Sequence, residues 1–281
     1  MRFPFAVTLA ISFVGCASSE PPPPLPPPTA ASSMVSAIPE VPDAGPPADA
    51  APPSAADAIR AAVAAPDRDE EDRQLDPGRH PAEMLSFFGI APGQKVGELV
   101  AAGGYTSELL ARVVGETGDV WAENPRSILD KFAAKPWEER LAKPIMKQVH
   151  SVERDLDSPF PPEARDLDAV VMVLFYHDAV WMKVDRAKMN KAAFDALKPE
   201  GVYGIIDHTA RPGSGTADVQ TYHRIDEKTV IDEVTKAGFK LAAEGDFLRN
   251  PKDTHDWNDS PRAAGNKRGT SDRFALKFVK P

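Results

Sequence analysis

The sequence has a single cysteine, Cys16, in 281 residues. One thiol cannot form a disulfide within the chain, so no disulfide framework stabilises the fold. Close spacings of the HxH or HxxxH kind, which mark many metal sites, are also absent. We therefore predict a fold held together by a hydrophobic core, with no metal ion.

Clusters of basic residues are missing as well. The formal net charge is −9, and no group of Lys and Arg alternates with aromatic residues. This composition argues against a nucleic-acid binder, which needs a positive surface for phosphates. Beyond the first residues, no apolar run approaches the roughly 20 residues that a membrane-spanning helix requires. The predicted partner is a small-molecule substrate.

Residues 1–19 have the pattern of an export signal, with one Arg, a mainly apolar run and then Gly15 and Cys16. The ending resembles the lipobox of bacterial lipoproteins, in which the cysteine after the cut receives a lipid, although Phe13 replaces the usual aliphatic residue. This resemblance implies a membrane anchor on Cys16 and a place in the bacterial cell envelope, facing the periplasm. The alternative is an ordinary signal peptide cut near residues 17–19, without a lipid.

Residues 20–54 are dominated by Pro, Ala and Ser and contain too little bulky apolar material to fold. We predict a disordered linker there, and one folded domain over residues 55–281. Within that domain, strands are expected at residues 96–100, 119–122, 147–152, 168–175, 202–207, 239–243 and 274–279. Helical patterns separate most of these strands, which predicts a layered α/β sheet.

The segment VGELVAAGGYTSELLA at 96–111 is typical of a buried strand that turns through small residues into an amphipathic helix. The N–H groups at such a helix start can bind a phosphate, carboxylate or ribose. Val100 and Ala102, however, occupy positions where glycine would let a ligand approach the backbone. Because a β-branched residue does not readily adopt a positive φ, we expect this loop to weaken ligand binding.

From about Asp76 to the C-terminus, the chain resembles a class I S-adenosylmethionine-dependent methyltransferase. The segment at 96–111 resembles the first strand and loop of that family, DLDAVVMVLFYHD its fourth strand, and LKPEG its "LKPGG" turn. The Tyr-His pair after the fourth strand, IIDHTA and HRID resemble a bacterial subgroup known chiefly as predicted methyltransferases. The resemblance implies a Rossmann-like, doubly wound, seven-stranded and mostly parallel sheet with an antiparallel last strand, and S-adenosylmethionine as cofactor.

The same resemblance implies roles for individual residues. The loop would face the methionine part of the cofactor, through Ala101, Gly103, Gly104 and Tyr105. Asn124, with Glu123 beside it, stands where an acidic residue usually binds the ribose hydroxyls. Asp155 would lie beside the adenine or would be one more exposed Asp in a charged loop.

Candidate catalytic residues follow the fourth and fifth strands. His177 is the preferred base, because neutral imidazole accepts a proton near neutral pH. Tyr176 would bind or stack on the substrate, or serve as a structural aromatic, and His208 would share the proton transfer or bind substrate. Asp178 is predicted to cap a helix that begins near Ala179, with orientation of His177 as the alternative.

Four side chains at the ends of these two strands, His177, Asp178, Asp207 and His208, are of the types that bind transition metals, but their spacing does not support a site. His223 and Arg224 are candidates to fold back on the cleft, and Asp226 to cap the next helix. The charged segment 67–80 is predicted to be solvated surface, although it could lie across a cleft. Residues 249–272 form either a lid that carries His255 and Trp257 or a surface excursion.

The predicted function is methyl transfer from S-adenosylmethionine to a small molecule. The alternative is a catalytically silent binding module of the same fold in the cell envelope, which the altered loop and a location outside the cytoplasm, where the cofactor is made, would favour. Another nucleotide-dependent enzyme, such as a dehydrogenase, has less support, because the G-x-G-x-x-G pattern is absent.

Overall fold

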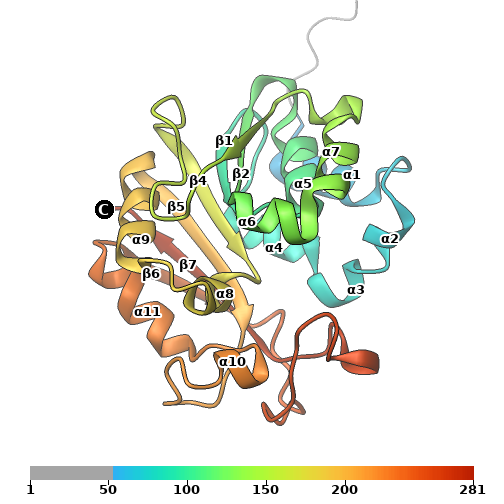
Figure 1. The fold of residues 1–281 in the computed structure, drawn as a ribbon. Coiled ribbons are helices and arrows are strands. Elements are labelled where there is room, and N and C mark those ends of the chain that lie inside the picture. Colours follow the sequence, from blue (N-terminus) through green and yellow to red (C-terminus); the bar gives the residue numbers. More distant parts are fainter. Residues whose placement is uncertain (1–52) are drawn as a thin grey trace, which may run out of the picture. The chain divides into compact units, whose positions relative to one another are not determined.

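The computed structural model describes residues 53–281 (Figure 1). The predicted export signal, the lipid on Cys16 and residues 20–52 of the predicted linker lie outside the described part. Ser54 accepts a hydrogen bond from the N–H of Asp57 and so caps the first helix. Within the described part, no helix has both the length and the apolar composition to cross a bilayer.

Seven strands form one sheet in the order β3-β2-β1-β4-β5-β7-β6. Strand β7 is antiparallel to both of its neighbours, and all other pairs are parallel. The predicted sheet is thereby confirmed. Its strands are β1 (Lys95–Leu99), β2 (Asp119–Asn124), β3 (Val149–Glu153), β4 (Leu167–Val173), β5 (Leu197–His208), β6 (Lys240–Gly245) and β7 (Arg273–Val279).

Helices cover both faces of the sheet. On one face α4 and α5 pack on the strands, with α1 against both, and on the other face α9 and α11 do so (Figure 1). The helices are α1 (Ala55–Ala64), α2 (Glu70–Arg73), α3 (Asp76–Arg79), α4 (Pro81–Phe88), α5 (Tyr105–Val114), α6 (Arg126–Ile128), α7 (Ala134–Leu141), α8 (Tyr176–Trp181), α9 (Arg186–Ala196), α10 (Val219–Tyr222) and α11 (Glu227–Lys236).

The core lies on both sides of the central strands, as the continuous apolar run of β4 predicts. Val170 and Val171, neighbours that point to opposite faces, are both buried, and each belongs to a different core cluster. Helix α4 lies close to the sheet at Gly204, where a Cβ would come within 2.5 Å of the Phe88 ring. Glycine at this position lets the helix pack directly against β5.

The strand order reverses direction between β1 and β4, which is where open α/β sheets bind ligands. The register pairs Leu99 with Met172 and Met172 with Ile205. The three central strands therefore end near the same level, and the segments that follow them start at one edge of the sheet.

Candidate functional site

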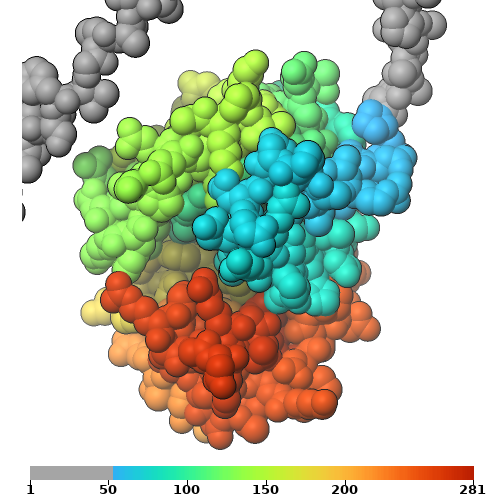
Figure 2. All heavy atoms as spheres, turned by 90° about the vertical axis from the view of Figure 1, so that its right-hand side faces the viewer, coloured from blue at the N-terminus to red at the C-terminus, as the bar shows by residue number. Residues whose placement is uncertain are grey.

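A cavity of about 970 Å³ lies at this edge of the sheet. It is lined by the loop after β1, the start of α8, the end of β5 and parts of segments 67–80 and 249–272. Figure 2 shows a hollow between the blue and cyan segment near the N-terminal end of the domain and the red segment near its C-terminus. Such a volume is at the upper end for sites that bind drug-sized ligands.

The two segments that border the hollow meet each other. A Cβ on Gly78 would lie 3.0 Å from the carbonyl oxygen of Gly269, and Arg273 donates a hydrogen bond to the carbonyl oxygen of Gly78. Residues between Glu71 and Arg79 line the cavity. The prediction that segment 67–80 is merely solvated surface is therefore wrong, and its alternative, a segment across the cleft, describes the structure.

The loop after β1 adopts the left-handed backbone that glycine favours, although its residues are not glycine. Val100 has φ 59° and Ala102 has φ 48°. The Val100 N–H donates to Glu123 Oε2 over 3.2 Å, and the Ala102 N–H donates to Asn124 Oδ1 over 2.7 Å. Val100 and Ala102 both line the cavity, so their side chains narrow this end of the site without closing it.

Helix α5 begins directly after this loop. Gly104 has φ 83°, and a Cβ there would lie 2.8 Å from the Trp137 ring, so only glycine fits. Ala101, Gly103 and Tyr105 line the cavity, whereas Gly104 does not. Among the described residues, the N–H of Gly103 has no hydrogen-bond partner and remains free to bind a ligand.

Glu98, which the sequence analysis did not single out, places a carboxyl group in the cavity wall. It lies in β1 two residues before Val100 and accepts a hydrogen bond from the Ser107 hydroxyl. Burial raises the pKa of Glu98 to about 7. The only signal in the sequence was a lone acidic residue inside an otherwise apolar strand.

Two arginines frame the same end of the cavity. Arg140, on α7, pairs with Asp72 and with Glu108 Oε2 at 2.5 Å, and donates from Nε to the Gly103 carbonyl oxygen over 3.0 Å. The Arg79 guanidinium lies over the Tyr105 ring, 4.4 Å from its centroid. Within the described part of the chain Arg79 has no carboxylate partner, so its charge is available to an anionic group in the cavity.

The residues predicted to hold the nucleoside lie behind the loop. Glu123 is fully buried with Oε1 unpartnered, and burial raises its pKa well above the ordinary value. The Asn124 amide holds the backbone of Ala102 through both its oxygen and its nitrogen. Neither residue lines the cavity. Asp155 is exposed and outside the lining, which matches the alternative of one more Asp in a charged loop.

His177 and Asp207 form a buried pair at the other end of the cavity. His177 Nδ1 lies 2.6 Å from Asp207 Oδ1, and the His177 N–H donates to Oδ2 over 2.7 Å. Burial favours neutral imidazole, but the adjacent carboxylate outweighs it and raises the pKa of His177. Nε2 of His177 is buried, lacks a hydrogen-bond partner, and belongs to a ring that lines the cavity.

His208 forms a second pair, with Asp259 from segment 249–272. Its Nδ1 lies 2.5 Å from Asp259 Oδ2 and 3.0 Å from the Ser271 hydroxyl. Here burial prevails over the carboxylate and lowers the pKa of His208. The ring centroids of His177 and His208 are 5.4 Å apart. The structure therefore brings together the two histidines that the sequence analysis placed at adjacent strand ends.

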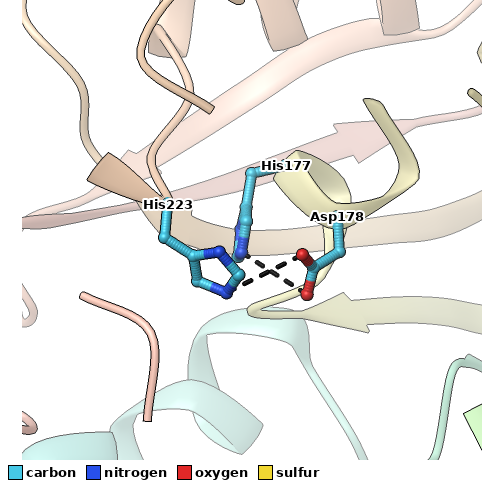
Figure 3. Close-up of side chains that lie close together, drawn as sticks. All are labelled: His177, Asp178 and His223. Atoms are coloured by element: carbon cyan, nitrogen blue, oxygen red, sulfur yellow. Dashed lines mark ion pairs between the residues drawn. The ribbon is translucent and has the colours of Figure 1, made fainter. Parts of the chain in front are cut away.

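A third histidine joins them. His223 follows α10 with φ 60°, and its ring lies edge-on to His177 with centroids 4.1 Å apart. Burial, followed by the nearby imidazoles, lowers the pKa of His223 to about 3. Asp178 lies beside both rings, and its carboxylate faces His177 and His223 (Figure 3). It does not cap a helix at Ala179, because α8 already begins at Tyr176 and Asp178 lies in its first turn.

Several predicted residues are structural. The Tyr176 hydroxyl bonds to Glu233 and Asn190, and the residue is fully buried outside the cavity lining, so the structure does not bring it into the site. Arg224 is buried in an ion pair with Asp253 and lies under the Trp257 ring.

The segment at 249–272 was expected to be either a lid over the cavity or a surface excursion, and it has features of both. Pro261 and Gly269 line the cavity, as a lid would, but His255 and Trp257 do not. Asp226 accepts from the N–H of Lys228 and caps α11, as predicted.

Comparisons with known proteins agree with the fold. No family model matches this sequence, and no curated protein matches it. Solved structures do match it, and they include S-adenosylmethionine-dependent methyltransferases. The strand order and the helices on both faces thus define a methyltransferase-type α/β fold.

One such structure, a SAM-dependent methyltransferase from Aquifex aeolicus, is 18% identical, has a TM-score of 0.53, and covers 75% of this chain and 97% of its own. A putative sarcosine dimethylglycine methyltransferase from Galdieria sulphuraria is 16% identical, with a TM-score of 0.53 and coverage of 80% and 98%. A putative methyltransferase from Haloferax volcanii, in complex with its activator Trm112, is 16% identical with a TM-score of 0.52 and coverage of 80% and 97%. At these identities the likeness concerns the fold.

Proposed function

We propose that the protein binds S-adenosylmethionine and transfers its methyl group to a small molecule. The observation that carries the proposal is the open cavity at the carboxyl ends of β1 and β4, within a sheet of this strand order. In open α/β sheets this is the place where nucleotide-sized ligands bind. The cofactor, when bound, supplies a methyl group on a positively charged sulfur.

The loop end of the cavity suits the methionine part of the cofactor. The Gly103 N–H and the Arg79 guanidinium provide free donors for the ligand's carboxylate, and Glu98 provides a carboxyl group for its ammonium. Because the pKa of Glu98 is about 7, the carboxyl group can lose its proton when the ligand binds, and the resulting carboxylate pairs with the ligand's ammonium group. Glu98 and Gly103 belong to the segment 96–111, whereas Arg79 comes from α3, so the match does not rest on one motif.

The unpartnered Oε1 of Glu123 lies outside the cavity lining, so a ribose hydroxyl reaches it only when the Val100 side chain moves aside. A buried carboxyl oxygen without a donor is destabilising, and a ligand hydroxyl would supply the missing hydrogen bond. Glu123 lies behind Val100, which lines the cavity and bonds to its other oxygen. The Val100 side chain therefore controls how closely a nucleoside can approach this oxygen.

The histidine end of the cavity suits the methyl acceptor. Asp207 fixes the orientation of His177, whose Nε2 is unpartnered and can accept the proton that a hydroxyl or amine loses during methylation. His208, held by Asp259 and Ser271, is the second candidate for this role. The acceptor itself is proposed only as a small molecule, in keeping with a cavity of about 970 Å³.

Calorimetric titration of the full chain with S-adenosylmethionine and S-adenosylhomocysteine tests the proposal. We expect binding with a Kd on the order of micromolar, or about −8 kcal/mol. The variant Val100→Gly/Ala102→Gly should bind several-fold more tightly, because it removes two side chains that narrow the loop end. Ala101→Gly is the matched control, since Ala101 has no positive φ, and it should not tighten binding.

Absence of binding up to millimolar ligand in both the natural chain and the double glycine variant would contradict the proposal. That result would leave the alternative of a catalytically silent module of the same fold.

A further inference from the structure

Three side chains at the histidine end of the cavity converge on one point. His177 Nε2 lies 3.6 Å from Asp178 Oδ2, and His223 Nε2 lies 3.7 Å from Asp178 Oδ1 (Figure 3). One potential ligand atom from each residue falls within 4.8 Å of the others. Atoms that lie about 2.0–2.1 Å from a tetrahedral metal ion are roughly 3.3–3.4 Å apart, so the distances of 3.6 and 3.7 Å need only small side-chain shifts to reach this geometry.

The unpartnered nitrogen of His177 is an independent observation that points to a ligand. His177 is 1% exposed, and Nε2 has no hydrogen-bond partner among residues 53–281. Its other nitrogen contacts the Asp207 carboxylate at 2.6 Å, which leaves the Nε2 lone pair directed toward Asp178 and His223. A carboxylate behind a histidine is the usual support for a metal-binding imidazole.

The chemistry and the access of the cluster favour one class of ion. Two imidazoles and one carboxylate suit divalent transition metals such as Zn²⁺, whereas Mg²⁺ and Ca²⁺ prefer oxygen ligands. All three residues line the cavity, so further coordination positions would face the space in which a small molecule fits. Sites with three protein ligands and an open position are typical of catalytic zinc.

We propose that His177, Asp178 and His223 bind a divalent transition-metal ion, with Zn²⁺ as the representative. The set differs from the four residues weighed in the sequence analysis. Asp207 lies behind His177 as its hydrogen-bond partner, and the Nδ1 of His208 is occupied by Asp259 and Ser271. His223 is the third ligand instead of Asp207 or His208. It lies too far along the chain from His177 for a metal-binding motif with short spacing to include both.

The ion also changes the assignment of the proton acceptor. A metal ion and a proton compete for Nε2 of His177, so the bound ion makes His177 a ligand and leaves His208 as the imidazole that accepts a proton. The metal site itself does not depend on methyl transfer. It can be tested without S-adenosylmethionine, and its failure would leave the cofactor titration unaffected.

The test is metal binding by the full chain after treatment with a chelator. Competition against a chromophoric chelator should show one Zn²⁺ per chain with a Kd on the order of micromolar or tighter, and Co²⁺ should give the visible absorption of a site with nitrogen ligands. We expect His223→Asn and Asp178→Asn each to weaken binding at least about tenfold. Asn tolerates the left-handed backbone at His223, so this variant keeps the local fold.

Two control variants separate this cluster from other candidates. Asp69→Asn alters a second cluster of possible metal ligands in residues 53–281, formed by Asp69, Asp72 and Glu108. Asp69 already pairs with Arg140 and Lys143. His150→Ala removes an exposed histidine outside both clusters. Both variants should bind Zn²⁺ as the natural chain does. Added Zn²⁺ should raise the Tm of the natural chain and not that of His223→Asn. Absence of stoichiometric Zn²⁺ binding by the natural chain, or binding that His223→Asn and Asp178→Asn leave unchanged, would overturn the proposal.

Discussion

At the scale of single residues, four of the nine non-glycine residues with a positive φ in residues 53–281 line the cavity. They are Val100, Ala102, Leu174 and His223. A left-handed conformation costs such residues roughly 1–2 kcal/mol each. The sequence analysis expected Val100 to avoid this conformation, but the hydrogen bond from its N–H to Glu123 helps to hold it there. Strain of this kind gathers at functional sites.

Ala102→Gly should therefore stabilise the protein. Glycine adopts φ 48° without the strain that alanine has there. After subtraction of the entropy that glycine adds to the unfolded chain, the free energy of unfolding should rise by roughly 0.5–1 kcal/mol. The free energy of unfolding in urea measures the effect. Ala101→Gly, one residue away and without a positive φ, should destabilise the protein instead. A loss of stability in Ala102→Gly as well would show that the strain carries no net cost.

The buried carboxyl group of Glu98 should make stability depend on pH. Its pKa is about 7 in the folded protein and near 4.5 when unfolded, so the folded state prefers the protonated form. Its contribution is complete below pH 4.5 and is lost as the pH rises through 7. Relative to Glu98→Gln, the natural chain should lose on the order of 3 kcal/mol between pH 5 and 8. Parallel unfolding curves for the two proteins across this range would contradict the shifted pKa.

At the scale of elements, ion pairs attach the N-terminal segment to the loop after β1. Arg140 on α7 contacts Asp72 on α2, Glu108 on α5 and the Gly103 carbonyl oxygen. These contacts explain why segment 67–80 lies across the cleft although its composition is that of solvated surface. Pairing between residues so distant in the chain leaves no periodic signal in the sequence.

Arg140→Met should test this attachment. The change keeps the apolar stem and leaves Asp72 without its cation, whereas Glu108 keeps Arg112 and Lys143. Breaking a buried pair in this way costs about 3 kcal/mol. Chemical denaturation gives the free energy of unfolding. Lys135→Met, on the same helix but in an exposed pair with Glu139, should change it by less than about 0.5 kcal/mol. Equal effects of the two substitutions would mean that the Arg140 contacts contribute little.

At the scale of the whole molecule, the sequence predicted the fold better than the site. Apolar runs and turn residues marked all seven strands, because burial on a sheet leaves a pattern along the chain. Residues directly after strands, such as His177 and His208, could be expected at one edge. His223 was expected to fold back on the cleft, and it lines the cavity. Glu98 and Asp259 could not be given their places, because each acquires its surroundings from segments distant in sequence. The start of α8 at Tyr176 was missed because no polar side chain caps it.

The close approach of Gly78 and Gly269 has a consequence for the entrance to the cavity. The two backbones approach closely there, since a Cβ on Gly78 would lie 3.0 Å from the Gly269 carbonyl oxygen, so rotation of a side chain does not separate them. Widening the entrance on this side requires two stretches of backbone to move apart, a collective motion that is typically in the microsecond to millisecond range. The width of the entrance on this side is therefore set by contacts within the chain, and ligands of different size would meet the same fixed edge.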